Sequence, residues 1–164
     1  MPAIQLKPQS VEIDAPRELV FQILSSFRRG RIAGDNSEST RLISEDGNVK
    51  TVEFVTRAGP FSYRTLEEVT LHRPERIEFK HLEGPLDFSE EEFTLDETSD
   101  GGTLLTHSGS FIWKRFPFFG WFGGVIYTRP MYHSVIRKHF VTLKEAAEAR
   151  AARSHIFRRD RTAS

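Results

Sequence analysis

The stretch SVEIDAPRELVFQILSSF, residues Ser10–Phe27, holds the change from strand to helix on which the predicted fold depends. Residues 4–13 alternate between apolar and polar side chains, as a strand with one buried face does. Asp14 and Pro16 then supply a helix cap and a proline near the first turn. Apolar residues at three- and four-residue spacing predict a short amphipathic helix over Arg17–Phe27.

Glycines and charged residues at 28–37 end the helical pattern. Beyond them, the chain consists of segments in which apolar and polar residues alternate, separated by turn sequences. The predicted strands are Thr40–Ser44, Val49–Arg57, Phe61–Leu71, Arg76–Leu82, Asp87–Glu97 and Thr103–Trp113. Their short connections favour antiparallel neighbours. With the first strand, the sequence therefore predicts a seven-stranded antiparallel sheet.

The C-terminal part of the chain predicts a long helix over residues 122–152, where apolar side chains recur at helical spacing. Because proline lacks a backbone donor, Pro130 predicts either a kink or a helix that begins near Arg129. Residues 153–164 are basic and polar and are predicted to be a flexible tail. Strands followed by one long helix indicate a single α+β domain, residues 1–152, with the helix laid across one face of the sheet.

Composition excludes several classes of function. Lys plus Arg and Asp plus Glu both total 23, so no overall charge favours nucleic acid. The absence of cysteine excludes disulfides, thiolate nucleophiles and cysteine-bound zinc, and no HExxH, phosphate-loop or dinucleotide motif occurs. We therefore expect no metal or cofactor. The N-terminal residues show no signal-peptide pattern, so we expect a cytoplasmic protein.

Three stretches together resemble the SRPBCC superfamily, the START-like or helix-grip fold of polyketide cyclase-like and coenzyme Q-binding proteins. They are Ser10–Pro16 followed by Val20 and Phe21, Glu83–Leu86 running into Phe93–Leu95, and Gly101–Thr103 at the start of the last strand. The resemblance covers roughly Ile4 to Arg150. It implies a hydrophobic cavity between sheet and C-terminal helix, which different members use for lipid carriage, quinone binding, or polyketide cyclisation and dehydration.

Alternation along the last strand places His107 on the face that carries aromatic side chains, which we expect to be the inner one. An imidazole there can hydrogen-bond a ligand or act as a general base. On the C-terminal helix, Arg129 and His133 are predicted to share a face with the apolar stripe. The predicted ligand-binding residues are Tyr63, Phe79, His81, Phe93, Leu105, His107, Phe111, Trp113, Arg129, His133, Ile136 and Phe140.

Two other features allow more than one interpretation. Glu67 adjoins Glu68, and we expect it to be a solvated strand residue rather than a buried acid or base. The aromatic segment Phe116–Phe122 is too short to span a bilayer. It fits a plug at the end of the sheet, a lid, a transient membrane contact or a dimer contact, and the oligomeric state stays open.

The leading hypothesis is binding or transport of a hydrophobic small molecule, such as a lipid, quinone or polyketide. One alternative is an enzyme of the polyketide cyclase or dehydratase type in which His107 is the base and Tyr63, Arg129 or His133 positions the substrate. A third is a protein-interaction or chaperone-like module, which the aromatic segment alone supports.

Overall fold

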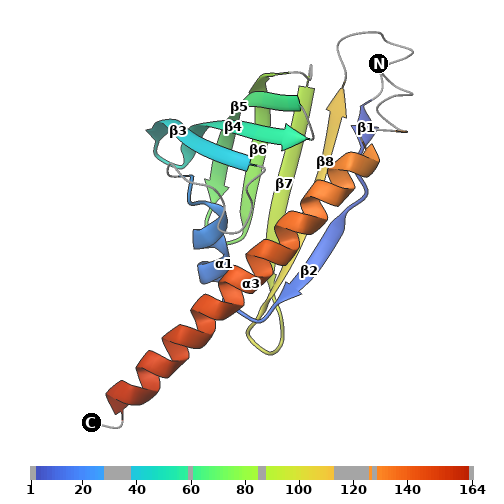
Figure 1. Cartoon of the computed structure of the whole chain (residues 1–164). Coiled ribbons are helices and arrows are strands. Elements are labelled where there is room, and N and C mark those ends of the chain that lie inside the picture. Colours follow the sequence, from blue (N-terminus) through green and yellow to red (C-terminus); the bar gives the residue numbers. More distant parts are fainter. Residues whose placement is uncertain are drawn as a thin grey trace.

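The computed structural model describes residues 3–27, 38–58, 61–84, 88–112, 126 and 129–162. The elements of this part of the chain are β1 (Ile4–Gln5), β2 (Gln9–Ile13), α1 (Arg17–Leu24), β3 (Glu38–Asp46), β4 (Val49–Ala58), β5 (Phe61–His72), β6 (Arg76–Glu83), β7 (Phe88–Glu97), β8 (Thr103–Ile112) and α3 (Arg129–Thr162). Figure 1 shows a curved sheet with α3 laid across it. The predicted α+β helix-grip fold is confirmed.

The sheet is antiparallel, in the order β1-β8-β7-β6-β5-β4-β3, with β2 also paired to β8. The first predicted strand is divided into β1 and β2, so the described residues form eight strands rather than seven. Pro8 explains the division, because it has no N–H to give to the ladder on β8. Just before it, the Leu6 amide still donates to the Gly109 carbonyl at 2.9 Å.

Helix α1 begins at Arg17 as predicted but ends at Leu24, three residues earlier than expected. The predicted cap is wrong, because Pro16 occupies the capping position and makes no side-chain cap hydrogen bond. The backbone N–H of Asp14 instead donates to Glu148 of α3 at 2.9 Å. This contact ties the turn before α1 to the long helix.

Helix α3 starts at Arg129, one of the two alternatives that Pro130 allowed. Its 34 residues span about 51 Å. The helix continues through Thr162, so the segment from residue 153, which we had expected to be a flexible tail, is helical. Figure 1 shows the C-terminal end of α3 extending past α1.

One stripe of α3 is buried against the sheet and α1. Its members are Ile136, Phe140, Leu143, Ala147 and Ala151. The strands contribute fully buried side chains to the same core, namely Val52, Val69, Ile77, Leu95 and Leu105. Because these strand residues face α3, they identify the inner face of the sheet.

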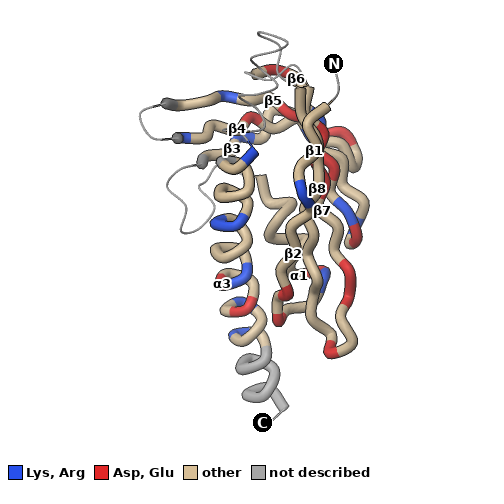
Figure 2. The backbone as a smooth tube through the Cα atoms, turned by 90° about the vertical axis from the view of Figure 1, so that its right-hand side faces the viewer, with Lys and Arg blue, Asp and Glu red and all other residues tan. Residues whose placement is uncertain are grey.

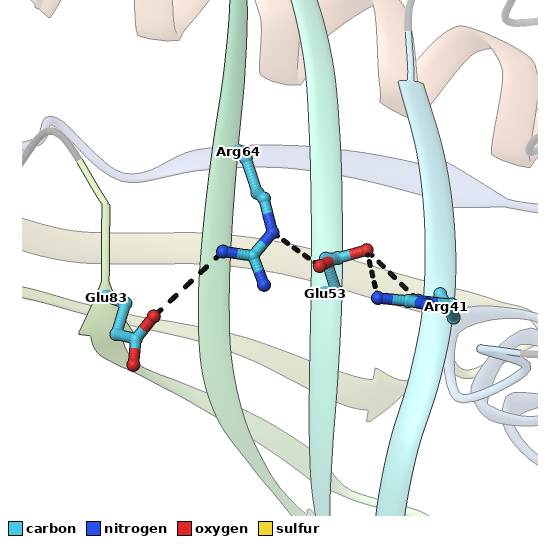
Figure 3. Close-up of polar contacts among 4 residues, drawn as sticks. All are labelled: Arg41, Glu53, Arg64 and Glu83. Atoms are coloured by element: carbon cyan, nitrogen blue, oxygen red, sulfur yellow. Dashed lines mark hydrogen bonds and ion pairs between the residues drawn. The ribbon is translucent and has the colours of Figure 1, made fainter.

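Charged residues lie along both the sheet and α3, with Lys and Arg interspersed among Asp and Glu (Figure 2). On the outer face, Glu53 of β4 lies between Arg41 of β3 and Arg64 of β5 (Figure 3). Arg41 Nε donates to Glu53 Oε1 at 3.1 Å, and Arg64 Nε donates to Glu53 Oε2. These two arginines lower the pKa of Glu53, Arg64 most strongly. The series ends on β6, where Arg64 pairs with Glu83 at 4.0 Å.

Candidate functional site

Polar side chains interrupt the apolar inner face of the sheet on β7 and β8. The register pairs Phe93 with His107 and Glu91 with Gly109, so all four lie on one face. Leu95 and Leu105, which are buried in the core, belong to the same alternation and fix this face as the inner one. Two ionisable groups, Glu91 and His107, therefore lie under α3 beside core residues.

Three polar side chains lie around the Glu91 carboxylate. Ser89 Oγ donates to Glu91 Oε1 at 3.1 Å, and His107 Nε2 lies 2.8 Å from Glu91 Oε2. The phenol of Tyr132, from α3, lies close enough to the same carboxylate for its pKa to be raised by it. We call these four residues, Ser89, Glu91, His107 and Tyr132, the Glu91 cluster.

Gly109 makes room for the Glu91 side chain. It lies directly opposite Glu91 on β8, and a Cβ added there would lie 2.8 Å from Glu91 Cγ and 2.7 Å from the Glu90 carbonyl oxygen. A strand glycine at such a position indicates close approach of neighbouring atoms. Because glycine has no side chain, residue 109 leaves the space that the inward-facing Glu91 carboxylate needs.

His107 is buried, with 1% of its surface exposed. Among the described residues, its Nδ1 atom has no hydrogen-bond partner. When Nε2 donates to the Glu91 carboxylate, a neutral imidazole leaves Nδ1 with a free lone pair. A buried polar atom without a partner costs free energy, so this nitrogen marks a place where a ligand hydroxyl gains a hydrogen bond.

Tyr132 closes the cluster from the helix side. Its ring stacks on Phe111 with centroids 5.7 Å apart and an interplanar angle of 9°. Burial raises the pKa of the Tyr132 phenol well above its usual range, and the nearby charges of Glu91 and Glu67 raise it further. The phenol therefore stays protonated at neutral pH and can donate to Glu91.

His133 follows Tyr132 on α3 and lies at the edge of the cluster. Burial lowers the pKa of His133, and the charges of Arg129 and His107 lower it further. His133 therefore lies close enough to both Arg129 and His107 to be affected by their charges. Phe140, deeper on α3, contacts Phe93 with ring centroids 6.3 Å apart.

A second polar group lies on the same inner face, on β5 and β6. Glu67 pairs in register with His81 on one side and with the fully buried Val52 on the other. Thr65 Oγ1 donates to Glu67 Oε1 at 3.0 Å. The expectation that Glu67 is a solvated residue is therefore wrong, because the strand alternation turns it inward. We call Thr65, Glu67 and His81 the His81 group.

Half-buried aromatic rings separate the two polar groups. Phe79 contacts Phe93 at 5.7 Å between centroids and Phe54 at 6.2 Å. Phe27, from the end of the α1 region, adds edge-on contacts to Phe54 and Phe79. Phe54, Phe79 and Phe93 are only partly buried although they lie on the inner face, so apolar surface stays accessible there.

The remaining predicted ligand-binding residues have different surroundings. Leu105 and Phe111 are fully buried, and Ile136 is nearly so, which makes all three parts of the packed core. Tyr63 shares the inner face but is 38% exposed. Trp113 lies outside the described residues, as does the aromatic segment Phe116–Phe122, and the lid, membrane-contact and interaction hypotheses rest on that segment.

Sequence reasoning missed Ser89, Glu91 and Tyr132. The signal for the first two was available, because Phe93 was assigned to the inner face and residues 89 and 91 have the same strand parity. Of the three consecutive glutamates at residues 90–92, only Glu91 has this inward parity. Tyr132 was counted only as one apolar position of the helix stripe.

The described residues contain no group of three or more His, Asp or Glu side chains arranged to hold a metal ion. Nor does any helix among them combine the length and the apolar character needed to cross a membrane.

Comparisons with known proteins agree with this architecture. The family described as "Polyketide cyclase / dehydrase and lipid transport" matches residues 8–148. No curated protein sequence matches the chain.

Solved structures with similar folds share little sequence with this chain. The Zhui aromatase/cyclase from a Streptomyces species superposes with a TM-score of 0.71 at 16% identity, covering 93% of this chain and 95% of that one. A START superfamily protein from Mycobacterium smegmatis gives 0.64 at 16% identity, covering 92% and 99%. A protein from Thermus thermophilus gives 0.65 at 18% identity, covering 92% and 99%.

Since the family match spans most of the chain, and the curved sheet and gripped helix are those of the START-like fold, this chain belongs to the polyketide cyclase/dehydrase and lipid transport family of the SRPBCC superfamily.

Proposed function

We propose that this chain binds a hydrophobic small molecule between the inner face of the sheet and α3, with a hydroxyl or carbonyl of the ligand placed at the Glu91 cluster. The Nδ1 atom of buried His107, which has no hydrogen-bond partner in the part of the chain that the structure describes, carries the proposal. The accessible rings of Phe54, Phe79 and Phe93 supply the apolar contact surface beside it. The family description, which includes lipid transport, fits a binding role.

The chemistry of the cluster favours an oxygen-bearing ligand over a plain hydrocarbon. An apolar molecule alone leaves Nδ1 of His107 without a partner, and that loss costs about 1–3 kcal/mol. A hydroxyl can donate to the free lone pair while its apolar body covers the phenylalanines. Burial of that body contributes about 25 cal/mol per Å² of apolar surface removed from water.

The test is native mass spectrometry of the protein purified from its own host, followed by extraction and identification of the co-purifying molecule. The unmodified protein is compared with His107→Phe and with the control His72→Phe. His72 is a suitable control because it bonds Glu78 at 3.1 Å on the outer face. We expect a ligand in the unmodified protein and the control, and its loss or sharp reduction in His107→Phe. Proteins that are all empty after such purification contradict the proposal.

A second candidate is an enzyme of the cyclase or dehydratase type, favoured by the contact between Glu91 and His107. A carboxylate that holds one imidazole nitrogen orients the ring and stabilises its protonated form, which suits the other nitrogen to act as a general base. Candidate polyketide substrates are assayed for turnover with His107→Ala and His133→Ala, and ligand binding is measured in parallel. Turnover that survives both changes excludes these residues as the catalytic base.

A further inference from the structure

We infer that the site has two polar anchors, the Glu91 cluster and the His81 group. Its ligand would then be an extended aromatic molecule with an oxygen-bearing group at each end rather than a single-headed lipid. This inference rests on the proposed function and adds to it the chemical class of the ligand. It stands on a second imidazole nitrogen that faces the same interior as the first.

His81 Nε2 is buried and, among the described residues, has no hydrogen-bond partner. Its position is fixed by tight packing. A Cβ added at Gly84 would lie 2.7 Å from His81 Cε1 and 3.0 Å from Thr65 Cγ2, so the imidazole lies directly against the backbone of residue 84. The glycine that the sequence suggested only as a turn residue therefore also makes room for this ring.

The two polar groups resemble each other in composition. His107 bonds to Glu91 at 2.8 Å, and His81 is the direct register partner of Glu67. Both carboxylates raise the pKa of Tyr132, so both act on the same point beneath α3. Each end thus combines an imidazole with a carboxylate, and each has one buried ring nitrogen that lacks a hydrogen-bond partner among the described residues.

The register gives the separation of the two anchors. Ile77 pairs with Phe93, and Phe93 pairs with His107, so His81 lies four residues along β6 and two strands away from His107. Steps of about 4.8 Å between strands and about 3.3 Å along a strand put the two α-carbons roughly 16 Å apart. Phe79 and Phe93 lie between the ends and offer ring faces and edges to an aromatic ligand.

A single-headed lipid satisfies only one end of this arrangement. A hydroxyl at the second end can donate to or accept from His81 Nε2 whichever tautomer the ring adopts. An added hydrogen bond to a buried group without a partner is expected to raise affinity about tenfold. The second anchor therefore selects for molecules that carry two separated oxygen groups.

The experiment compares p-terphenyl hydroxylated at both ends with its monohydroxylated counterpart, using titration calorimetry on the unmodified protein. We expect the diol to bind about tenfold more tightly than the mono-ol. In His81→Phe this advantage disappears, because the diol loses about tenfold in affinity. The mono-ol changes by no more than about twofold, since its one hydroxyl can still use His107. The control His72→Phe binds both compounds as the unmodified protein does.

Two additional variants guard against misfolding of His81→Phe, which is checked by thermal denaturation. His81→Gln keeps a polar nitrogen near the Nε2 position and is expected to retain part of the diol preference. Gly84→Ala displaces the imidazole without removing it but also strains the backbone, because Gly84 has a φ of +150°. Its folding is therefore checked in the same way, and the folded variant is expected to weaken only the diol. Equal affinity of the unmodified protein for diol and mono-ol overturns the two-anchor inference alone, as does a diol preference that survives His81→Phe. Failure of the unmodified protein to bind either compound overturns the aromatic ligand class inferred here, whereas the proposed function is contradicted only when the protein purified from its own host is also empty.

Discussion

Replacement of Glu91 by leucine tests whether the Glu91 cluster is an integrated part of the fold. The change leaves Ser89 and His107, both buried, without their acceptor, and removes the carboxylate beside Tyr132. Each buried group that loses its partner costs about 1–3 kcal/mol, so the two together cost roughly 2–6 kcal/mol. The apolar surface of leucine offsets roughly 1–2 kcal/mol. We expect a net decrease of about 1–4 kcal/mol in the free energy of unfolding.

The assay is urea denaturation at neutral pH, followed by circular dichroism. Glu90→Leu is the matched control, because Glu90 adjoins Glu91 on β7 but is exposed on the outer face. A surface change of this kind alters stability by no more than about 0.5 kcal/mol. Glu91→Gln keeps one acceptor oxygen and is expected to lose less than half as much as Glu91→Leu. If Glu91→Leu is no less stable than Glu90→Leu, the carboxylate is not the common acceptor described above.

Four further predictions use other parts of the structure. Gly109→Ala, whose Cβ would lie 2.8 Å from Glu91 Cγ, is expected to lose about 1–3 kcal/mol of unfolding free energy in urea, and an unchanged midpoint contradicts the packing argument. Ultraviolet titration is expected to show one tyrosine that ionises well above pH 10, and Tyr132→Phe removes it. In nuclear magnetic resonance titration His133 is expected to titrate below 6.5, so its protonation destabilises the fold as the pH falls from that value. The lowered pKa of Glu53 means that its ionised carboxylate stabilises the fold above about pH 4.5. Glu53→Gln is therefore expected to have a lower denaturation midpoint than the unmodified protein at neutral pH. This difference in midpoint is expected to disappear as the pH falls through the lowered pKa.

Strand parity explains which site residues were predictable. His107 was placed on the inner face because it alternates with aromatic residues along β8, and the structure confirms that position. Phe79 and His81 were assigned to a shared face on the same grounds, and they also face α3. Period-two alternation carries this information locally, without knowledge of the partner strand. The ligand-binding roles of these residues stay predictions.

The errors have a different physical origin. Glu67 was expected to face solvent because it adjoins Glu68 and only one of the two can face inward, yet its neighbours Val52 and His81 fix it on the inner face. Glu91 was not predicted as a site residue. Local sequence shows the cost of burial but not the hydrogen-bond partners that offset it, and those partners lie on other strands or on α3.

The sequence alone determined the succession of strands, the short helix after the first strand, and the start of the long helix at a proline. These features were predictable because alternation, helical spacing and the missing proline N–H act within a few residues. The tertiary structure alone decided that Glu91, His107 and Tyr132 meet. Their side chains come from two strands and a helix, and only the register of β7 on β8 and the placement of α3 bring the three side chains together. Burial of a carboxylate and an imidazole beneath a helix is tolerated when the two groups form a hydrogen bond that offsets their loss of hydration. No local sequence pattern encodes a pairing between residues so far apart in the chain.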